Sequence, residues 1–131
     1  MSDPSKMKFT SSHERVSRNG NRIRVGITDY FQDQLSDIVN IELPEPDDHH
    51  YEAGDAICVI ESLKTAADLH APVAGTIVAI NTDLHGSPEL INKDPFNAGW
   101  LVEMKPDRIQ DIARLMAFDE YEVALPEEEE E

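Results

Sequence analysis

The sequence predicts a mainly β fold, a sandwich or barrel of short antiparallel strands with small helices at its periphery. Short stretches of alternating or purely apolar residues recur along the chain, and turn signals separate them about every 8–12 residues. The helix-like stretches are brief and do not alternate regularly with strands, which argues against a doubly wound fold. A length of 131 residues is sufficient for one domain with its own core.

The first predicted elements are a strand and hairpin over residues 8–27. Asn19-Gly20 marks the turn, because this pair accepts the positive φ angles that a tight hairpin needs. A short helix follows and ends near Leu35. Either Thr28 or Asp29 can cap it, since each side chain offers an oxygen to the free N–H groups of the first turn.

A second hairpin is predicted around Lys64. Residues 37–43 alternate as a strand, and Gly54-Asp55 then begins the hairpin. Lys64 lies between the β-like segments 56–60 and 69–78, and so at the hairpin tip. A tip holds a side chain clear of the domain body, where a covalent swinging arm would be attached, although most turn lysines are simply solvated.

The C-terminal half predicts further strands over residues 76–81 and 100–105. Between them, Ser87-Pro88 can start a brief helix, with serine as N-cap and proline at the first helical position. After the last strand, Asp107 is expected to cap a helix over residues 108–117.

Composition limits the class of protein. The 27 acidic against 11 basic residues give a net charge of −16, which favours a monomer and excludes nucleic acid as a partner. The single cysteine, Cys58, excludes an internal disulfide and reads as a buried small side chain. No apolar stretch is long enough to span a membrane, and no signal peptide is recognisable. A cytoplasmic protein is expected, or a mitochondrial matrix protein if the chain is a processed eukaryotic one.

No catalytic constellation or metal site stands out, so no enzyme activity is expected. The chain lacks a nucleophile elbow, a glycine-rich phosphate loop and a Cys-x-x-Cys pair. His49-His50 beside Asp47-Asp48 is interpreted as a solvated loop, because adjacent histidines are not arranged for tetrahedral ligation. His70 is interpreted as a surface or strand histidine, and Trp100 as a core residue.

Residues 59–75, which include Glu61-Ser62-Leu63-Lys64-Thr65, closely resemble the lipoyl attachment segment of the glycine cleavage system H protein family. Further segments resemble the same family in the same order along the chain. They are Ser12-His13-Glu14, Val25–Asp29, Asp37–Val39, Leu43-Pro44, Ser87–Asn92, Asp94–Phe96 and Gly99–Leu101. The resemblance covers roughly residues 9–122.

This resemblance implies a lipoyl-type fold, a flattened barrel or sandwich of two small antiparallel sheets with peripheral short helices and a C-terminal helix. It implies that Lys64 carries lipoic acid in amide linkage. It also implies a polar cleft that shelters the loaded arm and is lined by Ser12, Glu14 and Asp68. The carboxylates of Glu14 and Asp68 could pair with a cationic amine.

The family's function implies a non-catalytic carrier protein that interacts in turn with three enzymes. A pyridoxal-phosphate glycine decarboxylase transfers an aminomethyl group to the arm. A tetrahydrofolate-dependent aminomethyltransferase then takes the one-carbon unit, and an FAD-containing dihydrolipoamide dehydrogenase reoxidises the dithiol. A lipoyl or octanoyl transferase, or a lipoate ligase, would attach the group.

Three positions depart from the family pattern. Arg15 stands where the family commonly has tryptophan, Ser36 where it often has glycine, and Thr65 where it often has alanine. The expected organisation is a flexible lead over residues 1–8, one lipoyl-carrier domain over 9–125 and a disordered acidic tail over 126–131.

Other carrier proteins remain alternatives. A free-standing lipoyl domain of a 2-oxo acid dehydrogenase complex usually has aspartate before the lysine, where this chain has Leu63. A biotin carrier typically has methionine on both sides of its lysine, unlike Leu63 and Thr65. An H-like protein that relays lipoyl groups in lipoate metabolism is not distinguished by the sequence.

Overall fold

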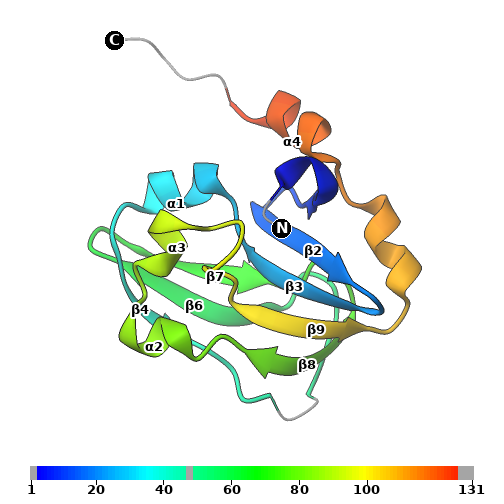
Figure 1. The fold of residues 1–131 in the computed structure, drawn as a ribbon, viewed down its shortest axis with the longest axis horizontal. Helices are drawn as coiled ribbons and strands as arrows, with labels where there is room; N and C mark the ends of the chain where they lie inside the picture. Colours follow the sequence, from blue (N-terminus) through cyan, green and yellow to red (C-terminus); the bar gives the residue numbers. More distant parts are fainter. Residues whose placement is uncertain (1–2, 47–48, 127–131) are drawn as a thin grey trace.

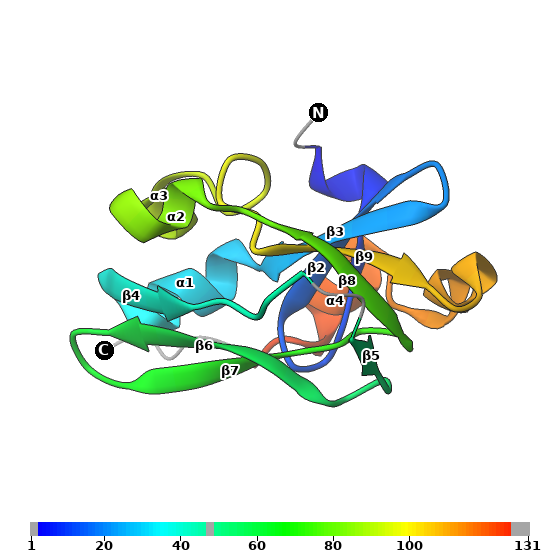
Figure 2. The ribbon, with the colours of Figure 1, turned by 90° about the horizontal axis from the view of Figure 1, so that it is seen from below.

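The chain folds into two antiparallel sheets that pack face to face, with short helices at the ends of the sandwich (Figures 1 and 2). This computed structural model describes residues 3–46 and 49–126. The predicted mainly β sandwich is confirmed. Most of the predicted acidic tail, residues 127–131, and the pair Asp47-Asp48 lie outside the described residues.

The larger sheet has six strands and the smaller has three. In spatial order the larger sheet contains β1 (Lys8–Phe9), β2 (Glu14–Asn19), β3 (Arg22–Ile27), β9 (Val102–Pro106), β8 (Gly75–Ile80) and β5 (His50–Tyr51). The smaller sheet contains β4 (Ile38–Glu42), β6 (Ala56–Ser62) and β7 (Ala66–His70).

Alternation along the strands builds the core between the sheets. On β3, Ile23 and Val25 are fully buried, whereas Arg22 and Arg24 point outward. The hairpin turn between β2 and β3 lies where it was predicted, and Gly20 has a φ of 67° there. Cys58 is buried as expected, and this burial raises the pKa of its thiol.

Helix α1 (Asp29–Leu35) begins as the sequence predicted. The Oγ1 atom of its N-cap Thr28 accepts a hydrogen bond from the N–H of Phe31 at 3.1 Å. At the other end of the helix, Ser36 has a φ of 68° and a ψ of −154°, a combination that glycine adopts most readily. Serine at this position therefore adopts a backbone conformation that glycine would adopt with less strain.

The region between β8 and β9 differs from the prediction. It contains two helices, α2 (Asp83–Gly86) and α3 (Leu90–Lys93). Ser87 is the C-cap of α2, and α3 follows Glu89, whose side chain makes no capping bond. The prediction that Ser87 caps the next helix was therefore wrong. Packing of Leu84 and Ile91 into the core explains the two separate turns.

The C-terminal helix prediction was also wrong in its bounds. In place of one helix over residues 108–117 there is a 3₁₀ helix, η2 (Ile109–Arg114), and then α4 (Phe118–Ala124). The chain is extended between them because Met116 forms a β-bridge with Phe9.

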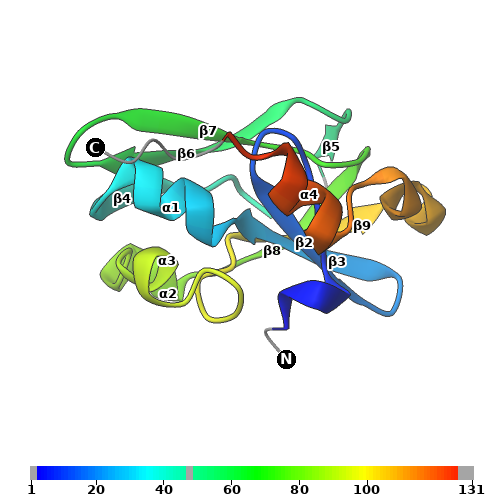
Figure 3. The same ribbon diagram turned by 90° about the horizontal axis from the view of Figure 1, so that it is seen from above.

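Helix α4 lies beside the N-terminal 3₁₀ helix η1 (Pro4–Lys6) and β1 (Figure 3). Met7, Phe9 and Tyr121 form a small second core at this place. The part of the predicted flexible lead that the structure describes thus contains a helical turn and the buried Met7. The expected domain boundaries remain predictions. None of the described helices has the length and apolar character of a membrane span.

Candidate functional site

Lys64 is exposed at the turn between β6 and β7, which projects at one end of the molecule (Figure 2). The Oγ of Ser62 accepts hydrogen bonds from the N–H groups of Lys64 and Thr65, at 3.2 and 3.1 Å. The side chain of Lys64 makes no hydrogen bond or ion pair with the described residues. A restrained backbone thus presents a free amine, as the sequence predicted.

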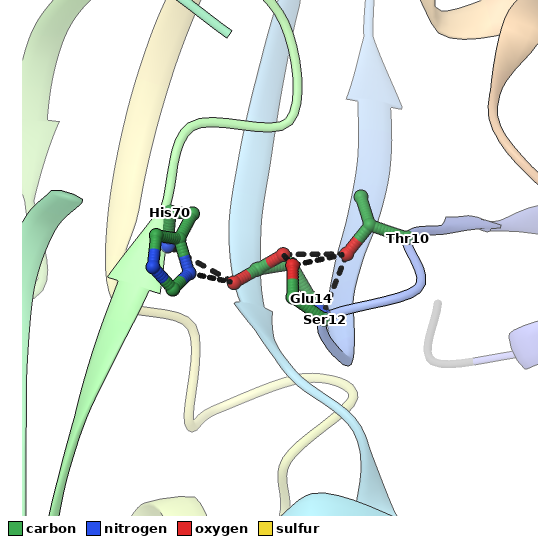
Figure 4. A network of polar contacts seen from close by, with 4 residues as sticks. All are labelled: Thr10, Ser12, Glu14 and His70. Carbon is green, nitrogen blue, oxygen red and sulfur yellow. Dashed lines mark hydrogen bonds and ion pairs between the residues drawn. The ribbon is translucent and has the colours of Figure 1, made fainter. Parts of the chain in front are cut away.

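Among the described residues, Glu14 is the one acidic side chain that is buried, with only 1% of it exposed. Its Oε1 accepts hydrogen bonds from the hydroxyl groups of Thr10 and Ser12, each at 2.5 Å. Its Oε2 accepts from the backbone N–H of His70 at 3.0 Å and lies 3.2 Å from Nδ1 of the same residue (Figure 4). The carboxylate therefore joins the two sheets of the sandwich.

The bend between β1 and β2 gives Glu14 this position. His13 has a φ of 74°, and its carbonyl accepts from the N–H of Thr28 at 3.1 Å. The ring of His13 is turned toward the second core, where Nδ1 lies 2.8 Å from the hydroxyl of Tyr121. In the Ser12-His13-Glu14 motif, the serine and glutamate side chains therefore bond to each other, while the histidine ring contacts the second core.

His70 can join this network because β7 is an edge strand. In the smaller sheet β7 pairs only with β6, and the neighbouring N–H of Ala71 donates to Asp55. The N–H of His70 is left free by the sheet and donates to Glu14.

A cleft of about 550 Å³ opens beside Glu14. Its polar lining comes from Thr10, Ser12, Glu14, His70 and Arg114. Its apolar lining comes mainly from Phe9, Pro72, Leu115 and Met116. The cleft thus combines an apolar wall with the buried carboxylate of Glu14 and the guanidinium of Arg114.

Asp68 lies apart from this cleft. It is exposed on β7 and is not among the residues that line the cleft. It shares one face of β7 with His70, because residues two apart on a strand point to the same side. The six residue-to-residue steps from Lys64 to His70 would span about 20 Å in a fully extended chain. Asp68 thus lies on β7 between the hairpin tip and His70.

Thr10 and the contact of His70 with Glu14 were not predicted from the sequence. Thr10 lies four residues before Glu14, a spacing that becomes a contact only because the chain bends between β1 and β2. The available signal for His70 was its place two residues after Asp68 on a predicted strand. Its partner, however, is 56 residues away in the chain.

Around His49-His50, at the edge of the larger sheet, the described residues form no cluster of three candidate metal ligands. His50 lies on β5, and its Nε2 is 2.7 Å from Oδ2 of Asp107. This hydrogen bond raises the pKa of His50. Asp107 therefore pairs with a neighbouring strand and does not cap a helix, contrary to the prediction.

Comparisons with known proteins agree with these features. The family described as "Glycine cleavage H-protein" matches residues 7–128. The glycine cleavage system H protein of Acinetobacter baumannii is 45% identical over 125 residues, 95% of this chain and 100% of that protein. That of Thermus thermophilus is 43% identical over 128 residues, 98% of this chain and 99% of that protein.

A solved structure is also similar. The crystal structure of a glycine cleavage system H protein from Mycobacterium marinum superposes with a TM-score of 0.81 and 34% sequence identity. The match covers 91% of this chain and 95% of the other.

Proposed function

The chain belongs to the glycine cleavage H-protein family, and we propose that Lys64 is the residue that carries its lipoyl group. Proteins of this family carry lipoate, and the chain has the lipoyl-carrying shuttle role in the glycine cleavage system. The observation that supports Lys64 is its free amine on a restrained turn at the end of the β6–β7 hairpin.

The surroundings of Lys64 suit an attachment point. Leu63, beside it, is 72% exposed and offers an apolar contact for a modifying enzyme or for the arm itself. Amide formation removes the positive charge of the lysine, so the modified side chain lies more readily against the protein. A tethered group reaches several active sites at a high effective concentration without a tight complex.

When bound, the lipoyl group supplies a dithiolane that accepts and delivers the aminomethyl unit. The proposed partners are a pyridoxal-phosphate glycine decarboxylase, a tetrahydrofolate-dependent aminomethyltransferase and an FAD-containing dihydrolipoamide dehydrogenase. The residues of this chain bind and orient, and the reactions belong to the partners' active sites.

The cleft beside Glu14 is the proposed shelter for the amine end of the arm. A carboxylate in a largely buried site attracts a cationic amine more strongly than an exposed one does. Thr10 and Ser12 hold the carboxylate from one side and His70 from the other, so it is oriented before the amine arrives. Asp68 contributes along the route to the cleft.

The experiment that tests this function combines intact mass with activity. Chain purified from a native source is expected to carry one lipoyl adduct, and Lys64→Arg is expected to lose both the adduct and all carrier activity in glycine–CO₂ exchange. Lys93→Arg and Lys105→Arg are matched controls, because both lysines are exposed and should leave adduct and activity unchanged. An adduct on either control lysine would overturn the assignment.

A further inference from the structure

A second polar site lies on the outer face of the larger sheet, on the side opposite Glu14. Arg15 follows Glu14 on β2, and neighbouring residues on a strand point to opposite faces. Although it is charged, Arg15 is only 1% exposed. Arg15 does not line the Glu14 cleft, so its charge belongs to a separate site.

The guanidinium of Arg15 is held in place by hydrogen bonds and forms no ion pair with the described residues. Its Nε donates to the carbonyl of Pro95 at 3.0 Å, and its Nη1 donates to Oγ of Ser17 at 2.8 Å. Its Nη2 is buried and has no hydrogen-bond partner among the described residues. No described carboxylate forms an ion pair with it, and buried charges are normally paired.

A second arginine adds to the positive charge. Arg24 lies opposite Ser17 on β3, and its guanidinium stacks over the ring of Trp100 at 4.2 Å. Trp100 is therefore partly exposed beneath an arginine and not in the core, contrary to the prediction. Burial, followed by the repulsion from Arg24, lowers the pKa of Arg15 to about 10. Arg15 still carries its charge at neutral pH.

These groups line a pocket of about 420 Å³. Its polar lining comes from Arg15, Ser17, Arg18, Asn19, Arg24 and Asn97, with no acidic residue among the described ones. Two carboxylates offset part of this charge. The negative charge of Asp94 acts on Arg15 without forming an ion pair, and Glu103 lies 3.3 Å from both Arg24 and Arg22 and is shared between them. Even when both carboxylates are counted, the three arginines leave the pocket a surplus of positive charge in a chain of net charge −16.

We propose that this pocket binds an oxyanion of the phosphate class. Arg24 and Arg18 would contact its oxygens, and the hydroxyl of Ser17, whose oxygen accepts from Arg15, is free to donate a hydrogen bond. The Nη2 of Arg15 is closed to solvent and does not contact the anion. Arg15 therefore adds positive charge to the pocket and orients the hydroxyl of Ser17 through their hydrogen bond. A doubly charged, tetrahedral anion matches several donors on different segments better than a planar monoanion does.

The acidic remainder of the chain does not prevent such binding. Charges farther away than the Debye length, about 8 Å at physiological ionic strength, are largely screened. The positive charge within the pocket therefore has the larger effect on anion binding. The pocket and the Glu14 cleft lie on opposite faces of the sheet, so an anion bound here would not compete with the arm. The proposal is thus independent of the carrier function.

The test is a calorimetric titration of the full-length chain with inorganic phosphate, at an ionic strength kept constant with chloride. The variant Arg24→Gln removes an exposed pocket arginine. Arg22→Gln is the matched control, because it is also exposed on β3, also pairs with Glu103 and does not line the pocket. We expect Arg24→Gln to weaken phosphate binding by roughly tenfold, the size of one charge-assisted hydrogen bond, and Arg22→Gln by less than about twofold.

Further titrations distinguish between the possible sources of the anion. Tighter binding of glycerol phosphate than of inorganic phosphate would support a phosphorylated metabolite, and equal binding would support free phosphate. The proposal is overturned if phosphate binds no better than chloride, if both arginine variants weaken binding equally, or if a glutamate-rich peptide binds this pocket more tightly than phosphate does. The last result would make the pocket a docking site for an acidic protein segment.

Discussion

Replacing Glu14 by alanine tests both the architecture of the cleft and its proposed role. The substitution removes the acceptor of Thr10, Ser12 and His70 at once. Ser12 is exposed, so its hydroxyl can turn to water. The N–H of His70 is only partly accessible and loses a charged acceptor, and such a loss typically costs about 1–3 kcal/mol. The expected fall in the free energy of unfolding is therefore about 2 kcal/mol, measured by urea denaturation.

Two further variants separate the sources of this loss. Glu14→Gln keeps an oxygen that can accept from His70 and removes the charge, so the free energy of unfolding should fall by only about 1 kcal/mol. Glu42→Ala is the control, because Glu42 is exposed on β4 and a surface substitution usually changes stability by less than about 0.5 kcal/mol.

The same variants measure protection of the loaded arm. If Glu14 pairs with the amine, Glu14→Ala should speed the release of ammonia from the loaded carrier by roughly tenfold, the value of one hydrogen bond to a charged group. Asp68→Ala should have a smaller effect, because Asp68 does not line the cleft. Wild-type stability of Glu14→Ala would refute the structural argument, and an unchanged release rate would refute the protective role.

Two other predictions concern the backbone and the pH dependence of stability. Ser36→Gly should raise the free energy of unfolding by about 1 kcal/mol, because it relieves a backbone conformation that costs about 1–3 kcal/mol for a residue with a side chain. Ser87→Gly, at a φ of −144°, should lower it, and equal effects in thermal unfolding would contradict the argument. Burial lowers the pKa of His13, so the unfolded chain takes up a proton first as the pH falls. Stability is then fully present above the ordinary histidine pKa of about 6.5 and decreases on acidification toward the lowered pKa. His13→Asn, which tolerates a positive φ, should show a smaller decrease between about pH 6.5 and 5 in urea titrations, and an unchanged slope would count against this origin.

Local signals predicted the elements whose cause is local. Asn19-Gly20 marked the first hairpin turn, and Thr28 marked the start of α1, because turn geometry and helix capping depend on a few adjacent residues. The C-terminal helices were predicted with wrong bounds. There, the β-bridge between Met116 and Phe9 outweighs the helical spacing of the apolar residues.

The candidate site divides in the same way. Lys64 was recognisable from the sequence because its position depends on a hairpin and its own turn. The partners of Glu14 were only partly recognisable, because His70 reaches it across the two sheets. Arg15 was noticed as a departure from the family pattern, but its burial on the outer face appeared only in the structure.

Periodicity and contiguous residues were therefore enough to predict the mainly β class, the exposed lysine at a hairpin tip and the resemblance to a lipoyl carrier. Only the tertiary structure decided that Ser12 and Glu14 share a cleft with His70, that Asp68 lies outside it, and that Arg15 and Arg24 form a cationic pocket on the opposite face. The physical reason is that burial and the pairing of charges depend on distances between strands that are far apart in the chain.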